Sequence, residues 1–231
     1  MGTRRLRRPR RLSKAISTPP WREGVPLADR TTLGVGGPAR GFAEVDGPEA
    51  LRRVLDAADS KGLEVRVLGG GSNLLVADDG YEGILVKLVD DDVVFHDQGC
   101  GDIVVDVAAG ADWDALVEDA VAREFAGIEC LSGIPGLAGA APIQNIGAYG
   151  QDVSEVVTTV TVVDRRDGSA HRVGASECGF GYRTSRFKQE SGRWIVTGLG
   201  LHLRRGGPPT CLLYTSPSPR DATLSRMPSS A

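Results

Sequence analysis

The sequence predicts a mixed α/β protein with two halves, at about residues 21–88 and 89–205. Two segments have the apolar spacing of amphipathic helices, and each lies among short runs rich in β-branched residues. The chain has 231 residues, 41% of them hydrophobic and 25% charged, which suits one large globular domain or two small ones. It contains neither an apolar run of about eighteen residues nor a signal-peptide pattern.

The first half contains one predicted helix and two predicted strands. The helix covers residues 46–62, where Pro48 suits the first turn and Gly62 suits the position after the last turn. Strands are predicted at 64–68 and 84–88. The apolar stripe of the helix consists of Leu51, Val54, Leu55 and Ala58.

The second half repeats this alternation. A helix is predicted over 113–125, and residues 131–150 are predicted to form a long loop or a broken helix because they are rich in Gly and Ala. Residues 164–169, DRRDGS, are predicted to be a hairpin turn. The helical stripe consists of Trp113, Leu116, Val117, Ala120 and Val121. The strands are predicted at 103–110, 156–164 and 193–203.

The net charge of −3 combines unlike segments. Residues 1–20 hold six Arg, one Lys and no acid, and this composition predicts a disordered leader or a wrongly chosen start codon, with contact to nucleic acid or anionic lipid as the alternative. Residues 21–210 carry −11. An acidic body of this kind argues against a nucleic-acid binder, which needs a basic face.

Cysteines and histidines are scattered along the chain. The four cysteines form no CxxC pair and have no nearby His, which argues against a disulfide framework or a metal site and favours a reducing compartment, the cytoplasm. The three histidines are isolated, so a Ser-His-Asp hydrolase has little support.

Residues 211–231, CLLYTSPSPRDATLSRMPSSA, have no hydrophobic period. Back-translated, they resemble the transposon-end adapter of short-read sequencing libraries. We interpret them as a non-native tail and exclude them from the fold. We therefore expect the gene's own sequence to stop near Thr210, with 206–210 as the start of a truncated linker.

Gly69–Asn73 is the first candidate ligand segment. Consecutive glycines after a strand let backbone amides approach an anion, and Ser72 and Asn73 add side-chain donors. No Walker lysine and no helix pattern follow, so neither a P-loop nor a dinucleotide fingerprint fits. A tight turn between strands is the alternative. The segment TTLGVGG at 31–37 is by itself only a turn signal.

Two further segments combine unusual residue types. IPGLAGAAPIQNIGAYG (134–150) surrounds the amides of Gln144 and Asn145 with small residues, which favours a ligand wall over Gly/Ala packing between helices. FGYRTSRFK (180–188) gathers aromatics and cations within an acidic body, which suits an anionic substrate. A solvated basic turn is the alternative for this second segment.

Taken together, these four segments resemble the UDP-N-acetylenolpyruvoylglucosamine reductase (MurB) family in residues, order and spacing, over about residues 21–205. PIQNIGAYG and FGYRTSRFK look like its type I subgroup. The resemblance implies an α+β fold, the vanillyl-alcohol-oxidase/p-cresol-methylhydroxylase-type FAD-binding domain, with subdomains at about 21–88 and 89–205. In the family a third, substrate-binding domain follows, and it is missing here.

The resemblance also implies chemistry. FAD is non-covalent, NADPH is the hydride donor, and the enolpyruvyl UDP-sugar becomes UDP-N-acetylmuramate for peptidoglycan and cell-wall synthesis. The resemblance implies no nucleic-acid partner and no membrane partner, and it implies that the protein is a monomer. The implied FAD contacts are Gly69, Gly70, Gly71, Ser72, Asn73, Leu74, Ile134, Pro135, Gly136, Ala141, Pro142, Gln144, Asn145, Gly147, Ala148 and Gly150.

The resemblance assigns Tyr182 and Arg183 to the substrate, and Arg183 to the negative charge that develops on the enolate. The family's proton-donating serine in a GSFF-type motif and its late glutamate have no counterpart in this sequence, so we expect little or no turnover from the fragment. The alternatives are another oxidoreductase of the same FAD superfamily, or an FAD-binding fragment without turnover.

Overall fold

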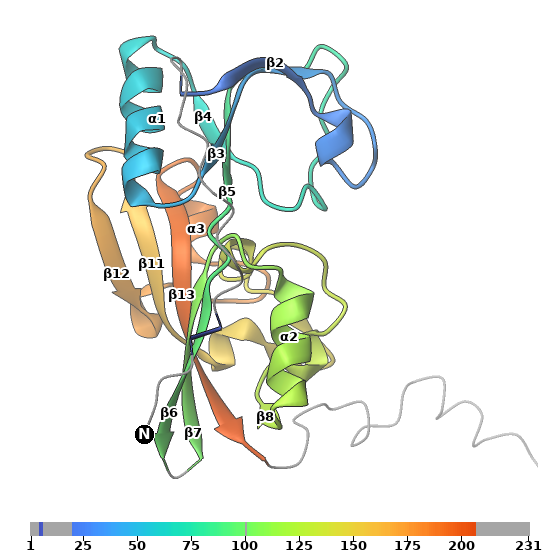
Figure 1. Cartoon of the computed structure of the whole chain (residues 1–231), viewed down its shortest axis with the longest axis vertical. Coiled ribbons are helices and arrows are strands. Elements are labelled where there is room, and N and C mark those ends of the chain that lie inside the picture. The colour runs from blue at the N-terminus through green and yellow to red at the C-terminus, as the bar shows by residue number, and fades with distance from the viewer. Residues whose placement is uncertain (1–4, 7–19, 100, 207–231) are drawn as a thin grey trace, which may run out of the picture.

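Two β-sheets, one above the other in Figure 1, organise the part of the chain that the structure describes. This structure is a computed structural model, and it describes residues 5–6, 20–99 and 101–206. The smaller sheet is formed by residues before position 89, and the larger one takes all but its first strand from residues after position 92.

The smaller sheet has the strand order β2-β3-β5-β4. Its strands are β2 (Arg22–Pro26), β3 (Pro38–Val45), β4 (Val65–Val67) and β5 (Tyr81–Leu88). β3 and β4 both run parallel to β5, whereas β2 is antiparallel to β3. Parallel neighbours require a crossover, and helix α1 (Pro48–Ser60) provides it between β3 and β4.

The larger sheet is antiparallel throughout, with the order β1-β6-β7-β13-β11-β12 and β8 paired to β13. Helix α2 (Trp113–Ala122) follows β7, and the four-residue helix α3 (Arg186–Gln189) precedes β13. The strands are β1 (Arg5–Leu6), β6 (Val93–Gly99), β7 (Asp102–Ala108), β8 (Phe125–Ala126), β11 (Val157–Asp164), β12 (Ala170–Gly174) and β13 (Trp194–Arg205).

A small hairpin stands apart from both sheets. It pairs β9 (Gly147–Ala148) with β10 (Gln151–Asp152). Its two-residue loop is Tyr149-Gly150, and both residues have positive φ, 52° and 84°. Positive φ at both loop positions matches the twist of an antiparallel pair. This hairpin closes the Gly/Ala-rich segment and fixes the direction in which the chain leaves it.

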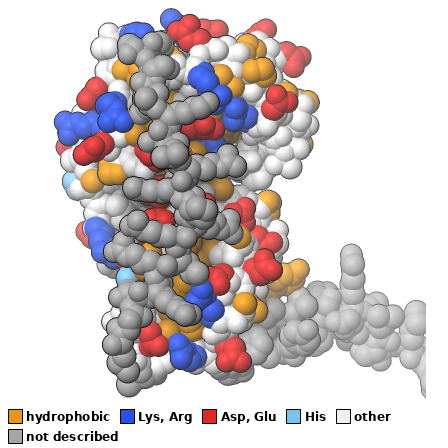
Figure 2. Space-filling view, viewed as in Figure 1, with side chains coloured by type: hydrophobic (Ala, Val, Ile, Leu, Met, Phe, Trp, Pro, Cys, Tyr) orange, Lys and Arg blue, Asp and Glu red, His pale blue; other side chains and the backbone are white. Residues whose placement is uncertain are grey.

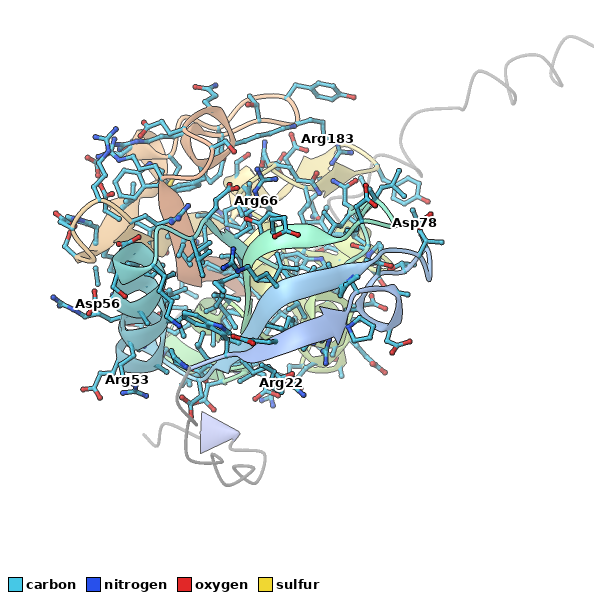
Figure 3. All side chains as sticks on the ribbon, turned by 90° about the horizontal axis from the view of Figure 1, so that it is seen from above. Arg22, Arg53, Asp56, Arg66, Asp78 and Arg183 are labelled. Atoms are coloured by element: carbon cyan, nitrogen blue, oxygen red, sulfur yellow. The ribbon has the colours of Figure 1, made fainter. Side chains whose placement is uncertain are left out.

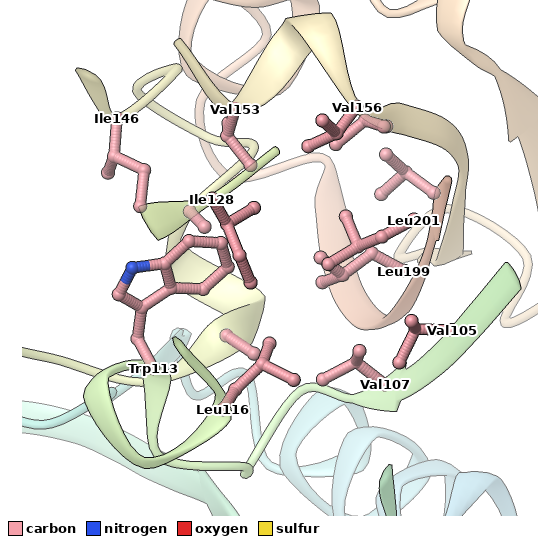
Figure 4. Packing of buried hydrophobic residues seen from close by; sticks show 14 of the residues in the cluster. Val105, Val107, Trp113, Leu116, Ile128, Ile146, Val153, Val156, Leu199 and Leu201 are labelled. Atoms are coloured by element: carbon pink, nitrogen blue, oxygen red, sulfur yellow. The ribbon is translucent and has the colours of Figure 1, made fainter. Parts of the chain in front are cut away.

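Two hydrophobic clusters hold the sheets. The first lies beneath the larger sheet, where Trp113 is buried among side chains of β7, β13 and the 128–156 region (Figure 4). The Trp113 indole N–H donates to the Leu131 carbonyl at 3.1 Å. The second cluster packs α1 on the smaller sheet and also includes Ala109, Val163 and Ile195 from the larger sheet's side. The two sheets therefore share buried apolar surface.

The predicted helices are confirmed with small changes of boundary. Every residue of the predicted α1 stripe is buried, but Val121 of the predicted α2 stripe is 50% exposed. The prediction for Val121 is wrong because Ala120 already occupies the edge of the packed face, and the next residue lies about 100° further round the helix. No helix among the described residues has the length and apolar character needed to cross a membrane.

The strand predictions identify β4, β5, β7, β11 and β13, and the predicted turn at 164–169 joins β11 to β12. They miss β2, β3, β6 and the turn of helix α3. β3 is interrupted by Gly41 and β6 has no alternating apolar face, so neither shows a strand pattern.

The terminal predictions lie largely outside the described residues. Within the leader at 1–20, Arg5–Leu6 form the short strand β1 beside β6. Residues 1–4, 7–19 and 207–231, which include most of the leader and linker and all of the adapter-like tail, lie outside the described residues.

Two valines one turn apart on α2 test the packing. Val117 is 1% exposed and Val121 is 50% exposed. We expect Val117→Ala to lower the free energy of unfolding by about 2 kcal/mol, because it leaves a cavity under the larger sheet. Val121→Ala should change it by less than about 0.5 kcal/mol. Urea unfolding followed by circular dichroism measures both, and equal losses would contradict the assigned helix face.

Candidate functional site

The glycine loop Gly69–Asn73 follows β4 and has unused backbone donors. None of the N–H groups of its five residues donates a hydrogen bond within the described part of the chain. Gly71 has φ +71°, and a Cβ there would lie 2.1 Å from the Arg30 carbonyl oxygen. Only glycine fits this close approach. The loop therefore offers a row of unpaired amide donors, which suits an anion.

The segment 31–37 packs directly against the glycine loop and its continuation. The Thr32 N–H donates to the Gly71 carbonyl at 3.1 Å, and the Gly37 N–H donates to the Ala77 carbonyl at 2.9 Å. A Cβ on Gly37 would lie 1.9 Å from the backbone oxygen of Asp78, a residue labelled in Figure 3. The turn signal at 31–37 thus marks the support of the glycine loop.

The glycine loop also meets the Gly/Ala-rich segment of the other half of the chain. A Cβ on Gly70 would lie 3.2 Å from the Cα of Gly136, and the Ser72 hydroxyl donates to the Pro135 carbonyl at 3.5 Å. Gly136 has φ +128°. The two predicted ligand segments, 63 residues apart in sequence, are in contact here.

Within the Gly/Ala-rich segment, the first small residues pack against protein. Ala138 and Gly139 are buried, and a Cβ on Gly139 would lie 2.6 Å from the Ala109 Cβ. Their N–H groups donate to the carbonyls of Ala111 and Ala109. For these two small residues, close packing within the protein, rather than a wall against a ligand, explains the lack of a larger side chain.

Other residues of this segment differ in their surroundings. The Gln144 side chain is partly exposed and forms no hydrogen bond within the described residues. Ile134 and Ala148 are partly buried against the first hydrophobic cluster. Outside this segment, Leu74 is partly buried against a third, smaller cluster, which consists of Leu27, Ala39, Phe42, Leu68 and Leu85. Ala141 and Pro142 are buried, and Gly150 is exposed at the tip of the β9–β10 hairpin.

Asn145 is a structural tie rather than an open recognition group. Its side chain is 2% exposed, Nδ2 donates to the Gly181 carbonyl at 3.0 Å, and Oδ1 accepts from the Ser154 N–H at 3.1 Å. Both polar atoms of the amide therefore form hydrogen bonds with the backbone. These bonds must break before the amide can bind the edge of a heterocycle.

Three hydrogen bonds attach the turn at 181–185 to the Gly/Ala-rich segment. Besides the Asn145 tie, the Ser185 hydroxyl donates to the Ile143 carbonyl at 2.6 Å, and the Arg183 guanidinium donates to the Gly147 carbonyl. Alternate residues of one segment, 143, 145 and 147, thus hold alternate residues of the other. We call these three bonds the wall–turn bonds.

Arg183 stands at the tip of a tight turn with an exposed, unneutralised charge. Gly181 and Thr184 exchange backbone hydrogen bonds at 3.1 and 3.2 Å, and Tyr182 is 89% exposed. Neither Arg183 nor Lys188 forms a salt bridge within the described residues. Figure 3 places Arg183 on the opposite side of the view from Arg22. The turn therefore presents positive charge that an anionic ligand can use.

Arg30 and Lys87 are site candidates that the sequence did not reveal. A pocket of about 240 Å³ beside the glycine loop is lined by both, together with Thr31, Thr32 and one carboxylate, Asp29. The Arg30 guanidinium lies 4.1 Å from the Phe42 ring centroid and 3.9 Å from the Glu44 carboxylate, and its buried Nε has no hydrogen-bond partner among the described residues. Arg30 and Lys87 are far apart in the sequence, so no linear motif joins them.

Two other kinds of site, a reactive thiol and a metal centre, find no support among the described residues. Burial raises the pKa of the Cys178 thiol to about 11, so the thiol is protonated near neutral pH and a poor nucleophile. The described residues contain no group of three or more His, Cys, Asp or Glu arranged to hold a metal. On the face seen in Figure 2, acidic and basic side chains are interspersed where the surface is not grey.

The fold is that of the vanillyl-alcohol-oxidase-type flavoproteins. p-Cresol methylhydroxylase with substrate bound superposes with a TM-score of 0.55 at 13% identity, over 76% of this chain and 37% of that one. The family described as FAD binding domain matches residues 39–174, more than half of the chain. The chain therefore belongs to the FAD binding domain family.

Closer relatives share a single name. The UDP-N-acetylenolpyruvoylglucosamine reductase of Nocardia farcinica is 46% identical over 193 residues, which are 84% of this chain and 49% of that protein. The crystal structure of the Thermus caldophilus UDP-N-acetylenolpyruvylglucosamine reductase (MurB) superposes with a TM-score of 0.66 at 34% identity, over 81% of this chain and 64% of that one. The chain spans about half the length of the curated relatives it matches.

The left-handed backbone of Arg183 is testable by two substitutions. Its φ is +53°, which a side chain with a Cβ adopts at a cost of about 1–2 kcal/mol. We expect Arg183→Gly to be more stable to urea unfolding than Arg183→Ala by about 1 kcal/mol. Both variants lose the guanidinium, so their difference isolates the backbone. An alanine variant as stable as the glycine variant would contradict the assigned conformation.

Proposed function

We propose that this chain forms the FAD site and part of the substrate site of an NADPH-dependent reductase acting on an enolpyruvyl UDP-sugar. The observation that carries the proposal is the convergence of four separate segments. Residues 31–37 and 134–136 both contact the glycine loop, and residues 143–147 hold the turn of Arg183. Relatives of 40–46% identity that are named for this reaction support the same function.

The residues present fit FAD. The unused N–H groups of Gly69–Asn73 suit the pyrophosphate, and Arg30 and Lys87 supply positive charge beside them. The glycines at 70 and 136 let the two loops, one from each half of the chain, come close together. When bound, FAD would supply the transfer of hydride from NADPH to the enolpyruvyl group. We infer that the halves at about 21–88 and 89–205 form the two sides of this cofactor site.

Arg183 supplies the charge that the substrate half-reaction needs. Addition of hydride to the enolpyruvyl β carbon leaves negative charge on the carboxylate side, and a fixed guanidinium beside it lowers the barrier. The planar fork of arginine keeps its charge at any working pH and matches a carboxylate. Tyr182, exposed beside it, contributes to the same proposed substrate site. The Gln144 amide has no hydrogen-bond partner among the described residues and is the better candidate than Asn145 for direct ligand contact.

The product of this reaction is UDP-N-acetylmuramate, a precursor of peptidoglycan. The proposal therefore places the protein in cell-wall synthesis in the cytoplasm, as a monomer that meets small molecules rather than nucleic acid or membrane. Reduction of the bound flavin by an alcohol rather than by NADPH would indicate a different oxidoreductase of the same fold.

Retention of FAD tests the cofactor site. We expect Gly70→Val to weaken FAD binding by about tenfold or more, because its side chain must enter the 3.2 Å gap to Gly136. Gly47→Val introduces the same side chain where nothing lies within 4 Å, and it should leave FAD binding unchanged. Flavin absorbance after desalting measures retention. Equal retention by both variants, or a folded wild-type chain that stays colourless, would contradict this site.

The role of Arg183 is tested in a version extended from the native gene to the length of the relatives. We expect Arg183→Ala to slow flavin reoxidation by the enolpyruvyl sugar by about 10²-fold, and Arg183→Lys to slow it less. Reduction of the flavin by NADPH should change much less, because no enolate forms in that step.

Anaerobic stopped-flow absorbance separates the two half-reactions of this experiment. Arg53→Ala, an exposed arginine on α1 labelled in Figure 3, is the control and should behave as wild type. Loss confined to the NADPH step would show that the assignment of Arg183 is wrong.

A further inference from the structure

The Arg183 turn needs a second support besides the wall–turn bonds. With φ at +53°, the backbone of Arg183 lies in the left-handed region that arginine avoids, and such conformations persist only where the surroundings hold them. The bond from the guanidinium to Gly147 fixes the side chain, and the peptide group after Arg183 is held on its N–H side, where Thr184 donates to the Gly181 carbonyl at 3.2 Å. The other side of that peptide group is the Arg183 carbonyl.

Helix α3 brings a lysine to that carbonyl. Lys188 lies five residues after Arg183, and its ammonium donates to the Arg183 carbonyl oxygen at 2.9 Å. The helix is rigidly placed at its start, because the Ser185 hydroxyl caps it by accepting from the Lys188 N–H and also donates to the Ile143 carbonyl. Phe187, which lies between Ser185 and Lys188 in the sequence, is 5% exposed and anchors the helix in the first hydrophobic cluster.

The far end of α3 is held by a carboxylate. Glu190 accepts from the Arg186 guanidinium at 2.9 Å, from the Arg193 guanidinium at 2.7 Å and from the Trp194 indole at 2.9 Å. These donors, the Trp194 N–H first, lower the pKa of Glu190, so it stays ionised near neutral pH. Lys188 therefore lies on a helical turn that is held at both ends. Its own ammonium has no acidic partner among the described residues.

We propose that Lys188 is a positioning residue for Arg183. Its ammonium holds the Arg183 carbonyl, keeps the backbone in the left-handed conformation, and so directs the guanidinium back toward Gly147 at the edge of the cofactor site. The proposal rests on the proposed function in one respect, that Arg183 is the cation that meets the charge of the substrate. Lys188 itself contacts neither substrate nor cofactor in this assignment.

The test follows Arg183 directly, by nitrogen-15 NMR of the 231-residue chain with excess FAD. In wild type the Arg183 Nη2 protons, which donate to the Gly147 carbonyl, should exchange slowly with water. We expect Lys188→Met, which keeps the aliphatic stem and loses the donor, to speed that exchange about tenfold or to broaden the signal beyond detection. Lys188→Arg restores a cationic donor and should recover most of the protection.

Two controls separate positioning from general support of the fold. Gln189→Met changes the neighbouring exposed residue of α3 and should leave the Arg183 signal unchanged. The Asn145 Nδ2 signals, which report the tie to Gly181, and the thermal unfolding midpoint should stay at wild-type values in Lys188→Met. An unchanged Arg183 signal in Lys188→Met would overturn the proposal. So would joint loss of the Asn145 signals and the midpoint without rescue by Lys188→Arg.

This readout does not depend on catalysis, so the two ideas fail separately. If Arg183→Ala left flavin reoxidation by the enolpyruvyl sugar intact, the proposed function of Arg183 would fail, while the effect of Lys188 on the Arg183 signal would still be measurable. If only the NMR result were negative, the catalytic role of Arg183 would stand and Lys188 would lose its role.

Discussion

The three wall–turn bonds are the constraint on which the proposed substrate side of the site depends. In two of them the backbone carbonyls of Ile143 and Gly147 accept from the side chains of Ser185 and Arg183, and in the third the side-chain amide of Asn145 donates to the Gly181 carbonyl. A side chain bonded to backbone fixes a position more firmly than contact between two flexible side chains, because fewer rotatable bonds must be ordered. Through these bonds the packing of the larger sheet sets the place of an exposed arginine.

On the side proposed for the cofactor, a different feature matters: glycines, which have no side chain, let the loops come close together. Gly71 approaches Arg30, and Gly70 approaches Gly136, at distances that a Cβ would not allow without displacement of the neighbour. The loops of the two halves meet there, and the amide donors of residues 69–73 stay unused. Positive charge comes from Arg30 and Lys87 on the smaller sheet's side. Within an acidic body of −11 over residues 21–210, these two cations lie where the loops converge.

The family match covers these two arrangements to different extents. The match to the FAD binding domain family covers residues 39–174 and includes the glycine loop and the Gly/Ala-rich segment. The turn that carries Arg183 lies beyond that match. Flavoproteins of 13% identity share the fold, whereas relatives of 40–46% identity share a name that describes one reaction. Fold and family therefore bear on FAD binding, whereas the proposed substrate contact lies in the turn at 181–185.

The sequence by itself determined the elements whose signal is local. The stripe of α1, the β-branched strands and the composition of the four segments are all visible without a structure, since helical spacing and glycine content are properties of neighbouring residues. It did not reveal β3, the exposure of Val121, or Arg30 and Lys87 beside the glycine loop. It also suggested Asn145 as a recognition group, whereas in the fold both polar atoms of its side-chain amide form hydrogen bonds with the backbone. Only the tertiary structure decided these points, because they depend on which distant backbone atom each side chain meets.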